Sequence, residues 1–324
     1  MKSLARAVCF VSILCLVMPA IPLNAQENHR RIRQGYSMRM WMDNRGALGR
    51  VVSDTAGGPG LEYPVGSGAE HVFGAGLWVG GKLDTAVVGN SPPVTLVTTA
   101  YEGWVGPYFE FFPGPSAADS IWQVSGRGTP RPSEWNGYWG NLIPPASFSD
   151  NDDYCLYDDS HVQVANHIPL HLKVAQSSFV WQDSYADGID ILEYRIVNTG
   201  VRQIDSAYVG LFLDGDVGSH YPVLTLNYAG SYPDIHLAYI ADPLDIGVTP
   251  VGLVPIASPV PLDSLRQSFR WWNAIQSPSF DVEKYEKLSQ GVIDTDGAIT
   301  SVADVRCLMS LGPFTIRAAR VFSS

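Results

Sequence analysis

The sequence predicts an all-β fold, an antiparallel β-sandwich of the jelly-roll or Ig-like kind, built as one large or two smaller β domains. Three observations indicate this class. The 324 residues include 31 glycines and 23 prolines, with only 16% charged residues, a composition that disfavours long helices. Short apolar stretches recur through the second half of the chain and are separated by turn residues. Helical periodicity is confined to one short stretch, residues 282–288.

The clearest predicted strands show alternation of apolar and polar residues. Leu170, Leu172 and Val174 alternate with His171 and Lys173, as in a half-buried antiparallel strand. Further strands are expected where apolar residues cluster, namely over Leu192–Ile196, Ala207–Leu213 (apolar on both faces and therefore central), Val302–Leu311 and Phe314–Val321. The run His71–Leu83 predicts a hairpin that turns at Gly80-Gly81.

The N-terminus has the three parts of a cleavable signal peptide. Lys2 and Arg6 precede a 12-residue apolar run, Ala7–Met18, and small Ala25 follows two prolines at a cleavage site. The run is shorter than the roughly 20 residues that span a bilayer. We therefore expect a secreted protein with no integral membrane span in the mature chain, located outside the cell or on the outer cell surface in preference to the periplasm.

Charge and segment composition complete the expected organisation. Removal of the signal takes away two of 21 basic residues, so the net charge moves from -11 to 19 - 32 = -13. An acidic chain repels nucleic acid, and we expect no nucleic-acid partner. The segments we expect are a signal peptide (1–25), a solvated basic leader (26–50), a Gly- and aromatic-rich β region (51–160) and a β-sandwich region (161–324).

Several short motifs recur along the mature chain. They are Asn44-Arg45-Gly46, Tyr63-Pro64, and the runs 74–81, 194–200, 208–218 and 312–314. Together they resemble large secreted surface proteins of Bacteroidota-type bacteria, many of which end in a type IX secretion sorting domain. The chain stops at Ser324 without such a domain. The expectation is either a fragment or a protein released rather than attached by that route.

Acidic turns are the candidate metal sites. Asp214-x-Asp216-x-Gly218 places two carboxylates on a tight turn at a strand end, as oxygen-ligand calcium sites often do. A second acidic cluster contains Asp150, Asp152, Asp153, Asp158 and Asp159. Neither has the EF-hand spacing, and both could simply be turns, which Asp and Gly favour. Structural Ca²⁺ is the cofactor that the sequence suggests.

Residues 101–140 hold ten aromatic residues in 40 positions, against 11% overall. Sugar rings could stack on Trp104, Trp135 or Trp139, with Glu102 and Glu134 nearby as in a carbohydrate-binding module or a glycoside hydrolase. The same aromatic residues could equally form the core of a sandwich.

Other catalytic signatures are missing from the sequence. His167 and His171 flank Pro169 in a strand-like run, where four residues span roughly 13 Å, too far for two ligands of one ion. No Gly-x-Ser-x-Gly motif occurs, so we predict no catalytic residue. Cys155 and Cys307 could form a disulfide or remain two unpaired buried thiols.

These observations favour a noncatalytic secreted or cell-surface β-sandwich protein with a structural or adhesive role, stabilised by calcium and with glycans or cell-surface components as partners. The alternative is a carbohydrate-binding module or β-sandwich glycoside hydrolase that uses the 101–140 region.

Overall fold

The chain forms three antiparallel sheets, in agreement with the predicted all-β sandwich. The computed structural model describes residues 30–50, 59–83, 93–103, 109–114, 119–160, 164, 167–218, 226–295 and 304–318. The predicted signal peptide, residues 1–25, lies outside the described residues. Within the described residues no helix is both long enough and apolar enough to cross a membrane.

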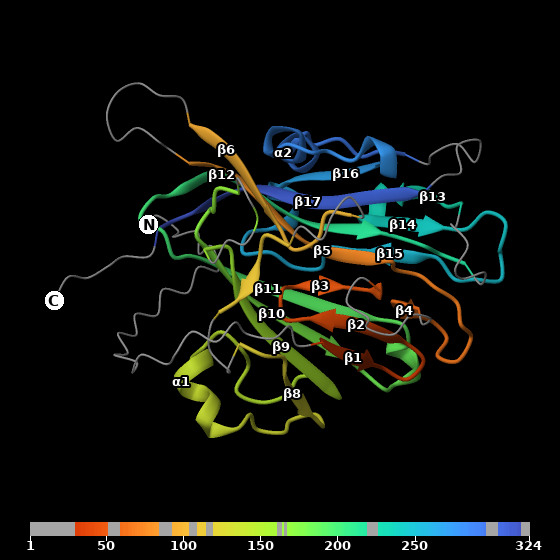
Figure 1. The fold of residues 1–324 in the computed structure, drawn as a ribbon. Helices are drawn as coiled ribbons and strands as arrows, with labels where there is room; N and C mark the ends of the chain where they lie inside the picture. The colour runs from red at the N-terminus through yellow and green to blue at the C-terminus, as the bar shows by residue number, and fades with distance from the viewer. Residues whose placement is uncertain are drawn as a thin grey trace.

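The largest sheet has nine strands, and its long members lie at the centre (Figure 1). Its strand order is β1-β2-β3-β5-β12-β17-β16, with β4 paired to β2 and β6 to β5. The strands are β1 (Arg30–Gln34), β2 (Arg39–Asp43), β3 (Ala47–Leu48), β4 (Leu61–Glu62), β5 (Gly74–Leu83), β6 (Val94–Thr99), β12 (Ile204–Asp214), β16 (Arg266–Asn273) and β17 (Val305–Ile316).

Two smaller sheets accompany it. The five-stranded sheet has the order β11-β10-β9-β7, with β8 on β9, and the three-stranded sheet has the order β13-β14-β15. Their strands are β7 (Phe112–Pro113), β8 (Trp122–Ser125), β9 (Asn151–Asp158), β10 (Leu172–Val180), β11 (Asp190–Asn198), β13 (Tyr228–Tyr232), β14 (Leu237–Ala241) and β15 (Val251–Leu253). The α-helices are the four-residue α1 (Asn136–Trp139) and α2 (Asp281–Ser289).

Both large sheets are covered on both faces. The main core lies between them and joins residues such as Leu77 of β5 to Val174 of β10. A second core, with Trp78 and Phe212 stacked 5.1 Å apart, fills the opposite face of the nine-stranded sheet beneath Leu288 of α2. A third core covers the outer face of the five-stranded sheet. Strands buried on both faces lose the alternation that marks a half-buried strand, which explains why β5, β9 and β10 are almost entirely buried.

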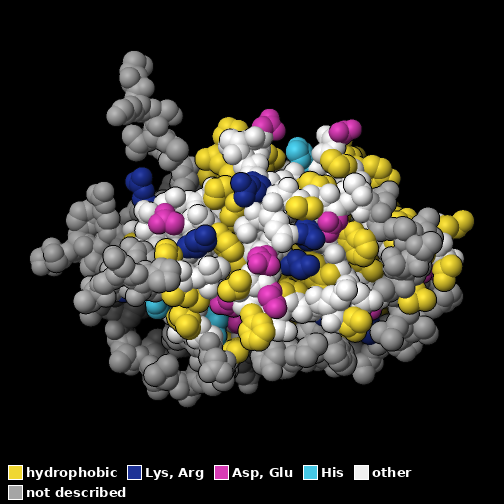
Figure 2. Space-filling view, turned by 90° about the horizontal axis from the view of Figure 1, so that it is seen from above, with side chains coloured by type: hydrophobic (Ala, Val, Ile, Leu, Met, Phe, Trp, Pro, Cys, Tyr) yellow, Lys and Arg dark blue, Asp and Glu magenta, His cyan; other side chains and the backbone are white. Residues whose placement is uncertain are grey.

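The face that α2 and β16 present to solvent carries basic and acidic side chains interspersed with apolar ones (Figure 2). The helix itself begins where the sequence pattern placed helical residues, and the Glu283 side chain accepts the backbone N–H of Phe280 at its N-terminus. Such a bond satisfies a donor that the first turn leaves open.

The predicted hairpin at Gly80-Gly81 is wrong. β5 runs without a turn through both glycines to Leu83. A Cβ on Gly80 would lie 2.8 Å from the Leu288 side chain, and one on Gly81 would lie 2.3 Å from Ile204. The glycines are therefore needed for close packing against α2 and β12.

The predicted solvated leader is also wrong in its described part. Residues 30–50 supply β1, β2 and β3. Arg45 is buried, its guanidinium lies 3.6 Å from the centre of the Phe109 ring, and its Nε donates to Asp43 at 2.8 Å. A cation that is paired and stacked in this way can be buried.

The boundary expected near residue 160 does not separate two units. β9 pairs with β10 across it, and β5 pairs with β12. The central strand expected at Ala207–Leu213 is confirmed as part of β12, between β5 and β17. The two strands expected near the C-terminus are one strand, β17, which continues through Gly312-Pro313.

Candidate metal centre

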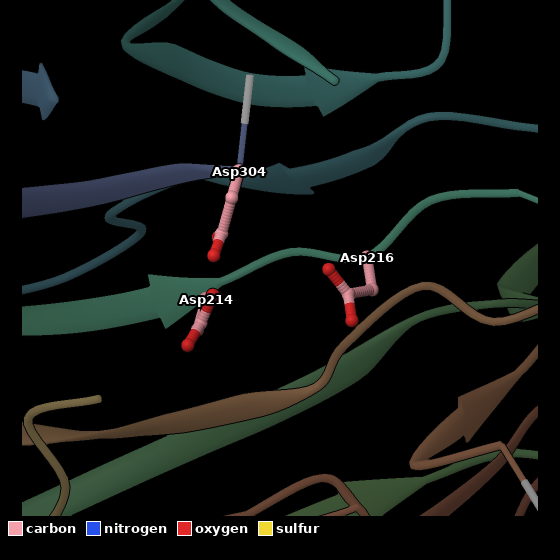
Figure 3. Close-up of side chains that lie close together, drawn as sticks. All are labelled: Asp214, Asp216 and Asp304. Carbon is pink, nitrogen blue, oxygen red and sulfur yellow. The ribbon is translucent and has the colours of Figure 1, made fainter. Parts of the chain in front are cut away.

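Three carboxylates, the Asp triad, converge where β12 ends and β17 begins (Figure 3). Asp214 is the last residue of β12, Asp216 follows two positions later, and Asp304 directly precedes β17. One ligand atom from each residue lies within 4.8 Å of the others. Asp214 and Asp216 are two of the residues that the sequence singled out, whereas Asp304 was not among them.

The local chain path explains why the two predicted residues point the same way. Side chains two positions apart in an extended chain lie on one face. Gly215, between them, packs against β14, and a Cβ there would lie 2.8 Å from Ile240 Cδ1. A larger residue at 215 would require Ile240 or the turn to shift.

Backbone bonds fix this turn on both sides. Phe73 N–H donates to Asp214 O at 2.9 Å, and Glu70 and Gly218 exchange two bonds of 3.0 Å. Buried Asn227 accepts the N–H of Val217 at 3.0 Å and donates to its carbonyl at 2.8 Å. The carboxylates are thus held on a rigid frame.

Burial makes the negative charge of the triad costly. Asp214 is only 3% exposed, and burial raises its pKa to about 7; Arg306 opposes the rise, while Asp304 and Asp216 add to it. Neighbouring Glu70 is buried as well, and burial raises its pKa to about 7. The hydrogen bond from Gly60 N–H and the charge of Arg50 oppose this rise, whereas the charge of Asp216 adds to it. A cation placed among these groups would favour their charged forms.

One counter-ion is already present. Arg306 Nε lies 3.2 Å from Asp214 Oδ2 as an ion pair without hydrogen-bond alignment, and Arg306 Nη1 donates to Ser277 Oγ at 2.8 Å. Hard cations such as Ca²⁺ take carboxylate and carbonyl oxygens at 2.3–2.6 Å, so oxygens within 4.8 Å of one another fit a shared ion.

Asp304 could not be found from its own neighbourhood in the sequence. It reaches the site because β17 pairs antiparallel with β12, with Arg306 opposite Asp214. Its backbone is held by Ala274 N–H, which donates to Asp304 O at 2.8 Å. The usable signal was an acidic residue at the start of one predicted strand and a second at the end of another, but the pairing of these strands was not predicted.

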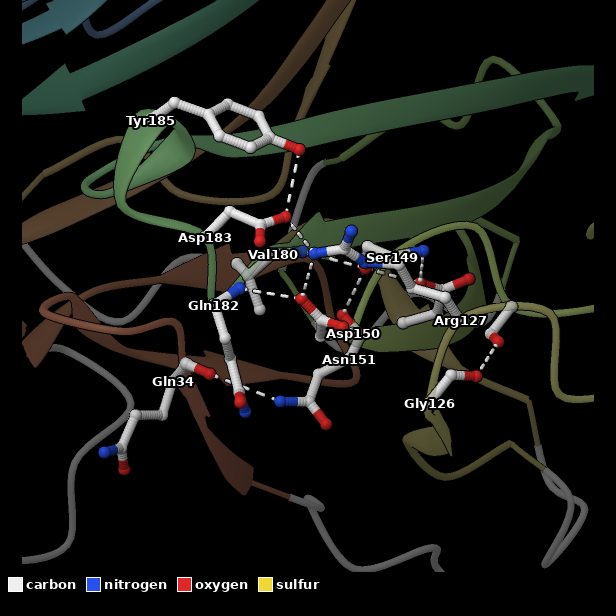
Figure 4. Close-up of polar contacts among 12 residues, drawn as sticks. Gln34, Gly126, Arg127, Ser149, Asp150, Asn151, Val180, Gln182, Asp183 and Tyr185 are labelled. Carbon is white, nitrogen blue, oxygen red and sulfur yellow. Dashed lines mark hydrogen bonds and ion pairs between the residues drawn. The ribbon is translucent and has the colours of Figure 1, made fainter.

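The second predicted acidic cluster does not assemble a cation site. Asp150 forms an ion pair with Arg127 at 2.7 Å and accepts Gln182 N–H at 2.8 Å (Figure 4). The same arginine also pairs with Asp183. Asp150 is therefore neutralised at the surface.

The remaining predicted carboxylates lie along β9. Asp152 and Asp153 are adjacent and so point to opposite faces, and Asp158 lies at the far end of the strand. Asp152 accepts four hydrogen bonds, and Asp158 accepts Ser160 N–H at 2.8 Å. Among the described residues, the Asp triad is the one group whose atoms meet the geometry of a shared ion.

The predicted sugar-binding residues that the structure describes are not brought together. Glu102 forms an ion pair with Lys284 of α2, on the helix-covered side of the nine-stranded sheet. Trp135 packs against Trp122 at 4.4 Å on the outer side of the five-stranded sheet, next to exposed Glu134. Trp104 and the Trp139 side chain lie outside the described residues. Tyr101, Phe109 and Phe111 are buried in the cores, as the core interpretation expects.

Glu102 instead belongs to a buried charge network. Its Oε2 and that of Glu110 lie 3.4 Å and 3.1 Å from Thr99 Oγ1, and Glu110 contacts His167 Nδ1 at 3.2 Å. Burial raises the pKa of Glu102, whereas for Glu110 the bond with His167 and the charge of Lys284 outweigh burial and lower the pKa. These carboxylates are thus paired with cations of the same chain.

The two histidines lie in different contacts, and the two cysteines form no disulfide. His167 Nδ1 lies 3.2 Å from Glu110 Oε1, whereas His171 is exposed and its backbone carbonyl accepts the Thr199 hydroxyl. Cys155 and Cys307 are buried on facing strands of the two large sheets, and no disulfide joins them.

Comparisons with known proteins give no relative from which to transfer a function: no family model, no curated protein and no solved structure matches the chain.

Proposed function

We propose that this chain is a noncatalytic extracellular β-sandwich protein with a structural or adhesive role, stabilised by Ca²⁺ at the Asp triad. The observation that carries the proposal is the convergence of three carboxylates from separate strand ends within 4.8 Å, one of them 3% exposed. Calcium sites of extracellular modules have dissociation constants of about 10⁻⁴–10⁻³ M, a range that suits a protein outside the cell.

The position of the site explains what the ion would do. β12 and β17 are adjacent long strands of the largest sheet, and the triad joins the end of one to the start of the other. An ion there would neutralise the mutual repulsion of Asp214, Asp216 and Asp304 and hold the end of the sheet closed. The function is therefore mechanical stability rather than turnover.

The test is a thermal unfolding curve of the mature chain with millimolar calcium and with a chelator. An ion at 100 times its dissociation constant stabilises by about 2.7 kcal/mol, which raises the melting temperature by about 5 °C for a chain of this size. D304N should abolish the shift, while D263N, at an exposed aspartate in the short helix before β16, should retain it. Equal melting curves with and without calcium would exclude the ion.

Export is tested separately. The predicted signal peptide ends at Ala25, so N-terminal sequencing of protein recovered from the culture medium or the cell surface should begin at Gln26. A full-length N-terminus retained inside the cell would contradict the extracellular role and leave the calcium measurement unaffected.

A further inference from the structure

Aromatic and charged side chains gather at one end of the five-stranded sheet, where β8 and β10 end and β9 begins. The strand register places Ser125 and Val180 on either side of Asn151, so the segments next to these three residues lie side by side. They form the sheet-end patch, whose members are Arg127, Phe148, Asp150, Trp181, Asp183 and Tyr185.

Two exposed rings belong to the sheet-end patch. Phe148 is 63% exposed, yet its ring packs edge-on against Phe179 and Trp181, with ring centres 5.6 Å and 5.8 Å away. Phe179 is part of the third core, so Phe148 is fixed on its inner side. Tyr185 is 78% exposed, and its hydroxyl donates to Asp183 Oδ2 at 2.9 Å. Exposed rings that are held in place in this way are typical of a binding surface.

The charged groups of the patch are paired with one another (Figure 4). Arg127 Nη2 donates to Asp150 Oδ2 at 2.7 Å and also to Asp183 Oδ2. Asp150 accepts Gln182 N–H at 2.8 Å as well. Arg127 and Asp183 nevertheless remain partly exposed. Exposed ion pairs contribute little to stability, so a ligand can share these groups without loosening the fold.

Backbone hydrogen bonds fix the segments that carry the patch. Gly126 N–H donates to Asp150 O at 2.9 Å, and Asp150 N–H donates to Val180 O at 3.1 Å. Gly128 N–H donates to Ser147 O at 3.0 Å, which joins the segment after β8 to the segment before β9. A surface whose side chains are already ordered loses less entropy when a ligand binds.

The chemistry of the patch fits a sugar. A pyranose ring has an apolar face of C–H groups, which packs on an aromatic ring, and a rim of hydroxyl groups that both donate and accept. The Phe148 ring offers the apolar surface, the Arg127 guanidinium offers donors, and the Asp183 carboxylate offers acceptors. Because the positive and negative charges of these side chains pair with each other, an uncharged ligand fits the patch better than a charged one.

We infer that the sheet-end patch binds a neutral oligosaccharide, with one sugar ring on Phe148 and its hydroxyl groups at Arg127 and Asp183. The patch contains none of the residues that the sequence singled out for sugar binding. The inference rests on the adhesive role proposed above, to which it adds the class of partner. It does not depend on calcium, since the patch shares no residue with the Asp triad.

The test is calorimetric titration of the mature chain with neutral hexasaccharides built from glucose, galactose or mannose. We expect saturable binding of at least one of them. F148A removes the exposed ring and should weaken binding at least about tenfold, equivalent to about 1.4 kcal/mol. The matched control is F280A, at an exposed phenylalanine next to α2, and it should bind as the unmodified chain does.

The polar groups have their own arm. R127A, which should fold as stably as the unmodified chain, should weaken binding about tenfold, whereas R266A, at an exposed arginine of β16, should not. Saturation by none of the three sugars, equal loss in F148A and F280A, or tighter binding of an acidic hexasaccharide of uronic acids would each overturn the inference.

The calcium proposal is separated from this one by D304N. The variant should lose the calcium-dependent shift in melting temperature and still bind the sugar. Absence of sugar binding together with an intact shift would overturn the sugar site alone, and the reverse result would overturn the calcium site alone.

Discussion

The aspartates along β9 and those after β12 have the same side chains but different surroundings. In β9, the two oxygens of Asp152 accept four hydrogen bonds, from Phe148 N–H, Ser149 N–H, Ser149 Oγ and Tyr154 Oη. After β12, Asp214 has an arginine, a distant tyrosine hydroxyl and two further carboxylates around it. Backbone and side-chain donors together satisfy Asp152, whereas Asp214 lies beside two further carboxylates. The number of acidic residues in a stretch therefore does not identify a metal site; their surroundings in the fold do.

The largest expected effect comes from removing the donor-satisfied carboxylate. D152A leaves buried N–H and O–H donors unpaired and should reduce the free energy of unfolding by about 3 kcal/mol. Chemical denaturation should show the same loss in calcium and in chelator. A loss confined to calcium would mean that Asp152 binds an ion, and the distinction between the two groups would fail.

Next is the loss of one member of the Asp triad. D216N should reduce stability in saturating calcium by about 2–3 kcal/mol, because the bound ion no longer contributes. In chelator the same change should be neutral or stabilising, since it relieves repulsion of Asp214 and Glu70 by Asp216. Destabilisation of equal size in both buffers would indicate a structural aspartate like Asp152.

The change in the free energy of unfolding with pH, measured without calcium, should be smaller than the effect of D216N in calcium. Folding raises the pKa of Asp214 and Glu70 to about 7, so their protonated forms contribute stability that is fully present below about pH 4 and is lost as pH rises through 7. Unfolding in chelator should therefore become easier by about 2 kcal/mol between pH 6.5 and 8. D216N should reduce this loss, and the His167–Glu110 pair, present in both proteins, cancels in the comparison.

The smallest effect is expected at the surface. R127A removes the ion pairs with Asp150 and Asp183, but exposed pairs contribute little. Its denaturation midpoint should be close to that of the unmodified chain, and the residual difference should vanish in high salt. A large, salt-independent loss would show that Asp150 has a structural role comparable to that of Asp152.

The sequence supported the fold class because alternation and turn spacing are local properties. The central position of β12 was also predictable, since Ala207–Leu213 is apolar on both faces. Gly80 and Gly81 were misread because their role depends on Leu288 and Ile204, which are distant in the sequence. The same applies to Asp304, whose proximity to Asp214 is a consequence of strand pairing.

The two buried cysteines can report how often the folded protein opens. Cys155 and Cys307 are completely buried, and burial raises the pKa of Cys307, so neither reacts while the cores are closed. Because no disulfide joins the two cysteines in the folded chain, refolding requires no oxidant and no disulfide exchange. A thiol reagent applied in pulses would label only molecules whose two sheets have separated. The rate of labelling would then report directly how often the sandwich opens, with no probe added to the chain.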